Sequence, residues 1–470
     1  MICNTSRGVR TTAQMSREPN HRLAALMAEA GVSNKGLARR VRDAGQGHGA
    51  DIRTSHVAVQ RWLQGGGIQP QTAAFVAEAL GEKLRRKLTL SDLGFVEVAH
   101  EVPSTGTGYD TSLSEALTML NSITQIIPDD KQTDASLLSE SDVNSAVFTW
   151  LVSRPDDLLS DSAAARRVDV RDVAAMRTVT DTFTQLDFLY GGGHGHATLR
   201  HYFQHEVVPL LKGNFTTEVG KALFGAAAET LSVLGWSAYD SGHHAVANRY
   251  LLSALRLAQA ADDRMLGACV LANLSHQANY LGQASRAVQL ARASVEGGKG
   301  GSTPRGMALF LAHEARALST AQDYTGAVRA MNEAEKCFER VDTADDPKWL
   351  SYMDEAELVG EFCHCFRDLK RGSEAVRFAE RAVALTDPKY ARTLGFVRMV
   401  LAQSQLLNGD LEEAVATATQ AVEAAEALQS ARFQRYVENF QHDISPYAGS
   451  AVIRQFKERV REAIVSTGGE

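Results

Sequence analysis

Apolar residues recur at intervals of three and four along most of this chain, the spacing that gives an α-helix one buried face. Only 10 of the 470 residues are proline, so few positions interrupt a helix. The pattern therefore predicts an all-α fold. It is absent from residues 1–18, where we expect a disordered leader, with Met15 as an alternative start of translation.

Residues 19–95 predict a small bundle of short helices. Helix two follows Ser33, and helix three follows Thr54 or Ser55, residue types that cap helix N-termini. A polar, glycine-rich loop is expected between these two helices at 44–53. A fourth helix is expected after Pro70, and a short fifth element closes the domain.

The next segments differ in how strongly they predict structure. Residues 96–112 are rich in Ser, Thr and Gly, which indicates a linker. Residues 113–225 predict a helical connecting region, in which a clear helix from Arg171 is followed by three glycines and a second helix.

Residues 226–430 predict a repeat. Ala-Val dipeptides recur there at intervals of about 40 residues, within the range of helical repeats. Small residues stand twelve positions before and seven positions after the Ala of four units, which lets two helices pack closely. These small residues are Ser275, Ala315, Cys363 and Ala402 before it, and Ser294, Ala334, Ala382 and Ala421 after it. We expect capping helices at 431–470.

Charge divides the chain into two parts. Residues 1–90 hold 14 Lys and Arg against 6 Asp and Glu, a formal charge of +8, whereas the rest carries −15. A basic domain on an acidic body is typical of a nucleic-acid binder, because only the docking surface meets phosphates. Five scattered cysteines, no signal peptide and no apolar run of membrane-spanning length predict a cytoplasmic protein.

Three segments of the first domain resemble the helix-turn-helix of the Xre family: GVSNKGLARRV, TSHVAVQRWLQGG and IQPQTAAFVAEAL. The resemblance is to the actinobacterial variant, which has an extended loop before the recognition helix. The resemblance implies that this helix enters the major groove of duplex DNA. The residues that it implies at the bases are Ser55, His56, Val57, Gln60 and Arg61. Those that neutralise phosphates are Lys35, Arg39, Arg40, Arg42 and Arg53.

The repeat segment LLNGDLEEAVATATQAVEAAE resembles the tetratricopeptide (TPR) pattern, which implies an α-solenoid with a concave binding face. One column of that face, eleven residues before each repeat's Ala, is polar, and its neighbours are polar or aromatic. This predicted groove comprises His276, Asn279, Tyr280, Arg316, His364, Arg367 and Gln403. A signalling peptide, a small molecule or a protein would bind there; the alternative is a solvated face without a ligand.

Two groups of residues raise the question of a metal site. The three glycines are followed by four histidines, His194, His196, His201 and His205. Of these, His201 and His205 have i,i+4 spacing. No Cys or Asp stands at ligand spacing, so we expect neither a metal nor another cofactor. The side chains of Cys363-His364-Cys365 diverge on a helix, and Cys363 fills a small-residue position, which favours a structural role.

Three functions remain open at this point. The first is a homodimeric transcription regulator, because the chain resembles negative regulators of Streptomyces differentiation and antibiotic production. The second is a TPR scaffold that does not bind DNA. The third is an enzyme, which we do not expect, since the sequence has neither a phosphate-cradling loop nor a nucleophile elbow.

Overall fold

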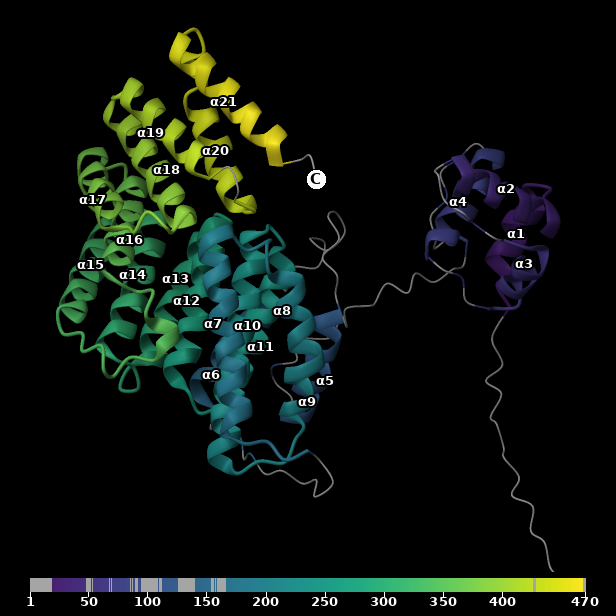
Figure 1. The fold of residues 1–470 in the computed structure, drawn as a ribbon, viewed down its shortest axis with the longest axis horizontal. Helices are drawn as coiled ribbons and strands as arrows, with labels where there is room; N and C mark the ends of the chain where they lie inside the picture. The colour runs from purple at the N-terminus through teal and green to yellow at the C-terminus, as the bar shows by residue number, and fades with distance from the viewer. Residues whose placement is uncertain are drawn as a thin grey trace, which may run out of the picture. The chain divides into compact units, whose positions relative to one another are not determined.

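The computed structural model consists of two compact units, residues 1–104 and 105–470. It describes residues 19–47, 54–66, 70–84, 112–125, 140–153, 166–425 and 428–467, together with isolated positions 52, 68, 86, 88, 92, 93, 109, 156 and 158. Within these residues the regular structure is helical, and β-pairing is limited to one bridge between Arg167 and Asn214 (Figure 1). The predicted all-α fold is confirmed.

The first unit is a bundle of four described helices around one apolar core. They are α1 (His21–Glu29), α2 (Asn34–Gly47), α3 (His56–Leu63) and α4 (Pro70–Leu84). Leu23, Leu37, Val59 and Leu80 are each 0 % exposed in this core, because each lies on the inner face of its amphipathic helix.

One boundary in this unit differs from the sequence prediction. The loop expected at 44–53 does not begin at Ala44, because α2 continues through Ala44 to Gly47; residues 48–51 and 53 lie outside the described residues. Ala44 packs against the apolar core, which favours another helical turn over the polar loop that the glycines suggested.

Five connecting helices open the second unit. They are α5 (Leu113–Gln125), α6 (Glu140–Val152), α7 (Val170–Tyr190), α8 (His196–Tyr202) and α9 (Val208–Leu211), with a π-helical turn at Phe203–Val207 before the last. Trp150 of α6 is 1 % exposed, and a Cβ on Gly267 would lie 2.6 Å from its ring. Glycine is therefore needed at 267 for α6 to pack this closely.

Stacked helical hairpins form the rest of the second unit (Figure 1). The hairpins are α10 (Thr217–Asp240) with α11 (His244–Ala260), α12 (Arg264–Tyr280) with α13 (Ala284–Gly298), α14 (Pro304–Thr320) with α15 (Tyr324–Phe338), α16 (Glu355–Asp368) with α17 (Gly372–Leu385), and α18 (Ala391–Asn408) with α19 (Leu411–Ala424). The first hairpin starts before residue 226, so that predicted boundary falls inside α10.

The small residues that predicted these hairpins are buried between their helices. All eight are at most 1 % exposed. Two of them also link the helices, since Ser275 donates to the Ala287 carbonyl at 2.8 Å and Ser294 to the Ala268 carbonyl at 2.6 Å. A side chain without bulk thus allows close approach, and a serine adds a buried hydrogen bond.

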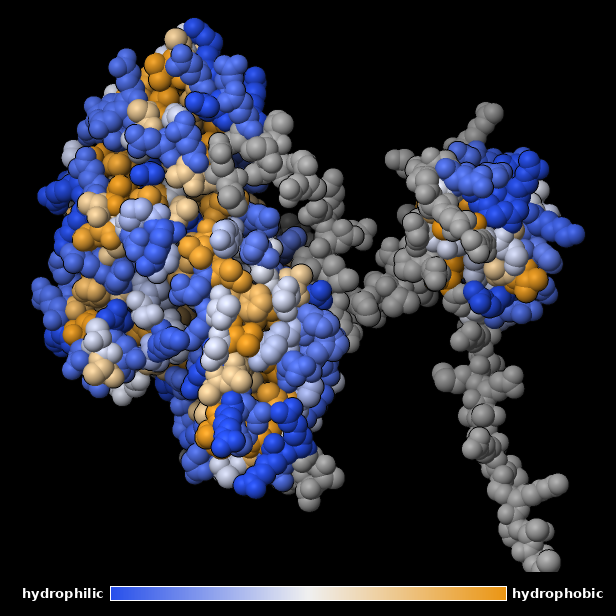
Figure 2. Space-filling model, viewed as in Figure 1, coloured by the Kyte–Doolittle hydropathy of each residue, from blue (hydrophilic) through white to orange (hydrophobic). Residues whose placement is uncertain are grey.

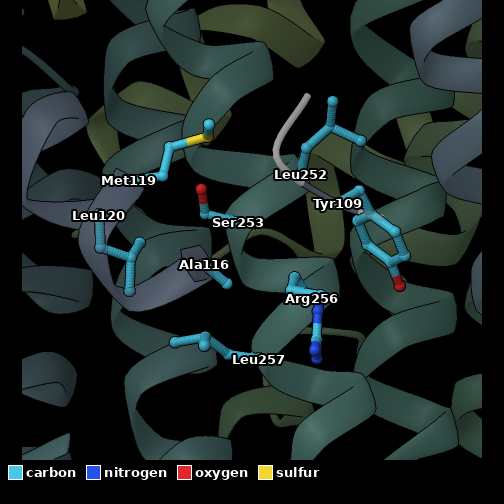
Figure 3. A pocket seen from close by; sticks show the side chains of 8 residues that line it. All are labelled: Tyr109, Ala116, Met119, Leu120, Leu252, Ser253, Arg256 and Leu257. Atoms are coloured by element: carbon cyan, nitrogen blue, oxygen red, sulfur yellow. The ribbon is translucent and has the colours of Figure 1, made fainter. Parts of the chain in front are cut away.

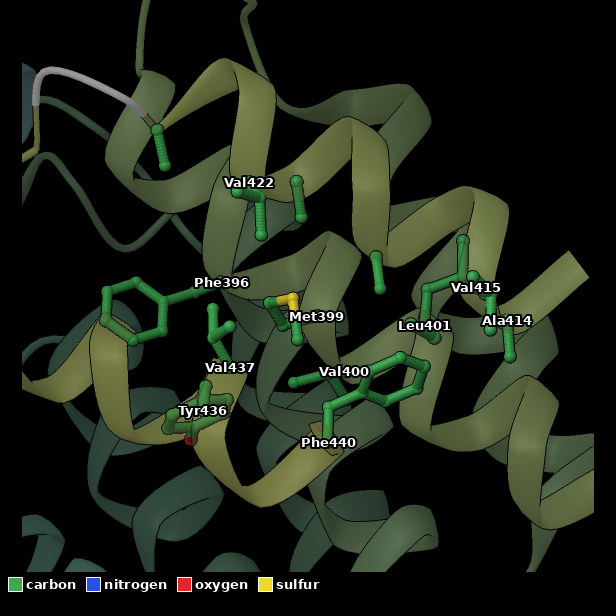
Figure 4. Close-up of a cluster of buried hydrophobic side chains, with 14 of the residues drawn as sticks. Phe396, Met399, Val400, Leu401, Ala414, Val415, Val422, Tyr436, Val437 and Phe440 are labelled. Carbon is green, nitrogen blue, oxygen red and sulfur yellow. The ribbon is translucent and has the colours of Figure 1, made fainter. Parts of the chain in front are cut away.

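The first helices of the hairpins form a closed inner ring. In chain order α10, α12, α14, α16 and α18 each contact the next, α18 contacts α20 (Ala431–Asp443), and α20 contacts α10. The apolar side of α20 packs on α18, where Phe396, Tyr436 and Val437 lie close together (Figure 4). The final helix α21 (Ala451–Thr467) packs on α19. The predicted cap at 431–470 thus supplies a ring helix.

A glycine turn fixes the start of α20 against α7 and α10. Gly191 has φ +86°, and a Cβ there would lie 2.7 Å from the Gln429 carbonyl oxygen. The backbone N–H of Gly193 donates to Gln429 at 3.2 Å, and that of Gln429 donates to Tyr190 at 3.0 Å. Only glycine allows this φ and this approach without strain, which explains the predicted glycine run between two helices.

Little apolar surface is continuous on the visible face of the second unit, where hydrophilic and hydrophobic residues alternate (Figure 2). Within the described ranges, no helix has the length and apolar character needed to cross a membrane.

A small pocket of the second unit lies between α5 and α11, with Tyr109, Met119 and Arg256 in its lining (Figure 3). Tyr109 is 2 % exposed and pairs with Gln259 at 2.7 Å, so its ring anchors the chain on α11.

Candidate nucleic-acid interface and inner polar cluster

Helix α3 has one buried and one exposed face. Val59 and Trp62 are 0 % and 3 % exposed and hold the helix to the core. His56, Val57, Gln60 and Arg61 lie on the other face and are exposed, Val57 to 60 %. The structure thus brings these four predicted residues together on one solvent-facing surface, as helical spacing requires.

Ser55 takes the capping position that the sequence offered to Thr54 or Ser55, and its contact with the bases stays a prediction. It is the N-cap of α3, and its hydroxyl accepts a hydrogen bond from the backbone N–H of Ala58 at 3.3 Å. A serine in extended backbone just before a helix satisfies one of the otherwise unpaired N–H groups there. Its side chain is therefore engaged in the helix itself.

Arg42 also bonds near the start of α3. It is half-buried, and its guanidinium donates to the Thr54 carbonyl at 2.5 Å. The bond ties α2 to the residue that precedes the cap of α3. This geometry makes Arg42 a positioning residue for α3, and its contact with phosphate stays a prediction.

Three of the remaining predicted phosphate ligands lie on α2. Lys35, Arg39 and Arg40 are exposed. Arg39 makes a loose pair with Asp43 at 3.7 Å, with both side chains largely in solvent, and such a pair contributes little to stability. Arg53 lies outside the described residues.

The residues of the predicted groove lie on the inner ring, as the repeat alignment implies. His276, Asn279 and Tyr280 belong to α12, Arg316 to α14, His364 and Arg367 to α16, and Gln403 to α18. Arg367 donates to the Gln403 side chain at 2.9 Å, which joins two hairpins. His276 contacts His313 of the next hairpin, with ring centroids 5.6 Å apart.

Three of the seven residues of this polar stripe are buried and the other four are half-buried, where an open groove was expected. His276, Arg316 and His364 are between 6 % and 8 % exposed. The reason is α20, whose Tyr436 hydroxyl lies 3.5 Å from the Arg316 guanidinium and whose ring lies 6.2 Å from that of His364. We name the stripe and its buried neighbours His313 and Glu361 the inner cluster.

One buried ion pair and three imidazoles with lowered pKa values set the electrostatics of the inner cluster, in which His313 Nδ1, His364 Nδ1 and Glu361 Oε2 have no hydrogen-bond partner among the described residues. Arg316 donates to Glu361 at 2.7 Å, with both side chains more than nine-tenths buried, so neither charge is left unpaired. Burial, and then the charges of Arg316 and Arg432, hold the pKa of His276 well below its usual value. Burial likewise lowers the pKa of His313 and His364.

Sequence reasoning missed several members of this interior. His313 and Glu361 stand three residues before Arg316 and His364, so one helical turn from the predicted column was the signal that pointed to them. Tyr239 donates to or accepts from His276 at 3.0 Å, and Arg432 and Tyr436 come from α20. Arg432 and Tyr436 lie outside the predicted repeats, and Tyr239 lies outside the four aligned units, so none of them carries such a signal.

The other histidines and cysteines do not converge. His201 and His205 stack at 4.2 Å, whereas His196 bonds Ser237 at 3.2 Å and its pKa falls to about 4, mainly through burial. His194 lies on Tyr190, 4.9 Å between ring centroids. Cys363 is buried and donates to the Gly360 carbonyl at 2.9 Å. Among the described residues, no three ligand-type side chains form a metal-binding group.

Comparison with known proteins adds one match to this geometry. Residues 23–96 match the family model of the SP15 N-terminal domain, so the matched segment starts in α1 and extends past Leu93, the last described residue of the first unit. A comparison of the whole chain with curated proteins finds no match.

Proposed function

We propose that this protein is a sequence-specific DNA-binding transcription regulator that reads the major groove with α3. One observation carries the proposal: α3 exposes His56, Val57, Gln60 and Arg61 on one face while Val59 and Trp62 hold the opposite face in the core. Imidazole, amide and guanidinium groups bond base edges, and an exposed valine fits a thymine methyl. An apolar side chain that is 60 % exposed among them has no role in the core.

Charge supports the same surface. Lys35, Arg39 and Arg40 are exposed on α2, the helix before α3, and residues 1–90 carry a formal charge of +8. Cations on the helix next to a recognition helix neutralise phosphates and fix its register on the duplex. Arg42 supports the assignment in another way, since it holds the start of α3 in place.

We further propose that the hairpin body regulates this activity and that two copies act together as a homodimer. A single α3 spans one half-site, and two related heads read a palindrome. The resemblance to actinobacterial regulators implies repression of development or secondary metabolism. A cytoplasmic location follows from this role and belongs to the same proposal.

Salt-dependent binding of the full-length chain to duplex DNA tests the proposal. We would measure anisotropy of a labelled random-sequence duplex at increasing salt concentrations, for the wild type and for Arg39→Gln/Arg40→Gln. Losing two phosphate contacts should weaken binding for any sequence and reduce the slope of log K against log salt by about 2. The matched control is Arg329→Gln/Arg461→Gln, which removes two exposed arginines of the body.

Selection from a random duplex pool then recovers preferred sites and shows whether the binding is sequence-specific. Binding that is equal for both double variants would reject α2 as the phosphate surface. If the wild type does not bind DNA at low salt, the regulator proposal fails and the protein is better explained as a helical-repeat scaffold.

A further inference from the structure

Aromatic rings surround one arginine in the interior of the second unit. The guanidinium carbon of Arg432 lies 4.6 Å from the ring centroid of Tyr239, 4.8 Å from that of Phe396, 5.2 Å from that of Trp236 and 5.9 Å from that of Tyr280. These distances are those of cation–π contacts. We name these four aromatic residues the cage.

A buried carboxylate completes the cage. Asp240 is 0 % exposed, and its Oδ1 lies 3.4 Å from Nη1 of Arg432. The same oxygen accepts from Arg392 at 2.8 Å, and Oδ2 accepts from the backbone N–H of Gly192 at 3.1 Å. Asp240 therefore supplies negative charge at the cage but is shared among three donors.

The geometry selects a flat, weakly hydrated cation. Arg432 is 6 % exposed, its ion pair is the longest that Asp240 makes, and its Nε has no hydrogen-bond partner among the described residues. The ring faces therefore contribute more to its binding than directed hydrogen bonds do. A guanidinium loses less hydration than an ammonium and stacks on aromatic faces, so the cage favours it.

Arg432 and two residues of the cage come from helices that are far apart in the sequence and in contact in the ring. Trp236 and Tyr239 lie on α10, the first ring helix, whereas Arg432 lies on α20, the last. Tyr280 of α12 and Phe396 of α18 complete the walls. Inserting one side chain into the cage thus fastens the last ring helix to the first.

We propose that the cage is a guanidinium-binding site whose ligand in the intact chain is Arg432, and that this occupancy keeps the ring closed. The proposal depends on the second unit alone and stands whether or not the protein binds DNA.

Chemical rescue of a full-length Arg432→Ala variant tests the site. The variant keeps the cage, Asp240 and its partner Arg392, which lies 5.6 Å from the Phe396 ring and 6.0 Å from the Trp236 ring, but it loses the guanidinium of Arg432. Its thermal unfolding midpoint should therefore fall by about 3–6 °C. Millimolar methylguanidinium should recover a measurable part of this loss. Backbone amides of α20 should exchange hydrogen faster in the variant and slow again when methylguanidinium is added.

Controls separate specific binding from solvent effects. Arg461→Ala removes an exposed arginine of α21 and should neither lose the stability nor respond to methylguanidinium. Methylammonium should rescue Arg432→Ala less well, because it is more strongly hydrated and lacks a planar face. If Arg432→Ala does not fold, Arg432→Met keeps the length and volume of the stem and takes its place.

Three results would overturn the proposal. One is no gain from methylguanidinium in a folded Arg432 variant. Another is an equal gain in the wild type or in Arg461→Ala. The third is equal rescue by methylammonium, which would show that the site does not select a guanidinium.

Discussion

The exposed face of α3 and the inner cluster use the same kinds of side chain in opposite surroundings. On α3, His56, Gln60 and Arg61 face solvent around an exposed valine. In the inner cluster, His276 and Arg316 are at least nine-tenths buried; His276 bonds Tyr239, and Arg316 pairs with Glu361. Exposed polar groups are available to an external partner, whereas buried ones must be satisfied internally or they destabilise the fold. Residue type alone therefore does not identify a binding surface.

The largest effect expected from this contrast is that of removing a buried charge. Asp240→Asn leaves Arg392 and Arg432 without their shared anion inside the protein. An unpaired buried charge costs about 3–5 kcal/mol, so the free energy of unfolding of the second unit should fall by that order. Urea denaturation of the full-length chain, followed by circular dichroism, measures it.

The matched control makes the same substitution at the surface. Asp262→Asn removes a carboxylate that is 42 % exposed and 2.8 Å from Lys221. Exposed pairs contribute about 0–1 kcal/mol, so its midpoint should hardly move. Equal midpoints for the two variants would contradict the assignment of Asp240 as the shared anion of the ring.

On α3 the same kind of truncation should affect DNA and leave folding unchanged. His56→Ala and Arg61→Ala each remove an exposed side chain of the proposed base-reading surface. Losing one base contact costs about 1–3 kcal/mol, or roughly five- to a hundredfold in affinity for a selected site. Anisotropy on selected and random duplexes measures both affinity and specificity. Wild-type affinity in both variants, with unchanged unfolding, would reject α3 as the recognition helix.

The inner cluster also predicts a pH dependence. Because burial and neighbouring cations depress the pKa of folded His276, the unfolded chain takes up the proton first as the pH falls below the ordinary value of 6.5. The stability contribution of neutral His276 is therefore complete above pH 6.5 and decreases as the pH falls. His276→Gln cannot titrate, so it should lose less stability on acidification than the wild type.

The cost of the glutamine substitution at neutral pH should be modest. It replaces one hydrogen bond with Tyr239, worth about 1–1.5 kcal/mol. Urea midpoints measured on both sides of pH 6.5 give the two slopes. Parallel slopes for the variant and the wild type would show that His276 is not the titrating group.

Local signals in the sequence predicted the elements that depend on local physics. Helix periodicity, caps such as Ser55 and the small residues at 275, 315, 363 and 402 were sufficient for the hairpins, because each acts within one or two helices. The same periodicity placed His56, Gln60 and Arg61 on one face of α3. Ring closure was not predictable in this way, since Asp240 and Arg432 meet across 192 positions.

The burial of the predicted groove follows from that closure. His276 and Arg316 fit a polar column equally well whether the solenoid is open or closed, because the difference lies in the path of α20. No repeat alignment specifies that path. Ser55 and Arg42 in the first unit show a related limit: each bonds at the start of α3, and their sequence positions alone do not separate a cap or a positioning residue from a DNA contact.

The smallest predicted effect tests whether Ser55 is a cap or a base contact. Ser55→Ala removes the hydrogen bond to the Ala58 N–H and should destabilise the first unit by about 1 kcal/mol. Ser55→Asn retains a good capping oxygen, so it should restore that stability. If capping is the only role of Ser55, the asparagine variant keeps both the wild-type stability and the wild-type site preference in the anisotropy assay. A changed site preference with normal stability would instead place Ser55 among the residues that read bases, next to His56 on the same turn of α3.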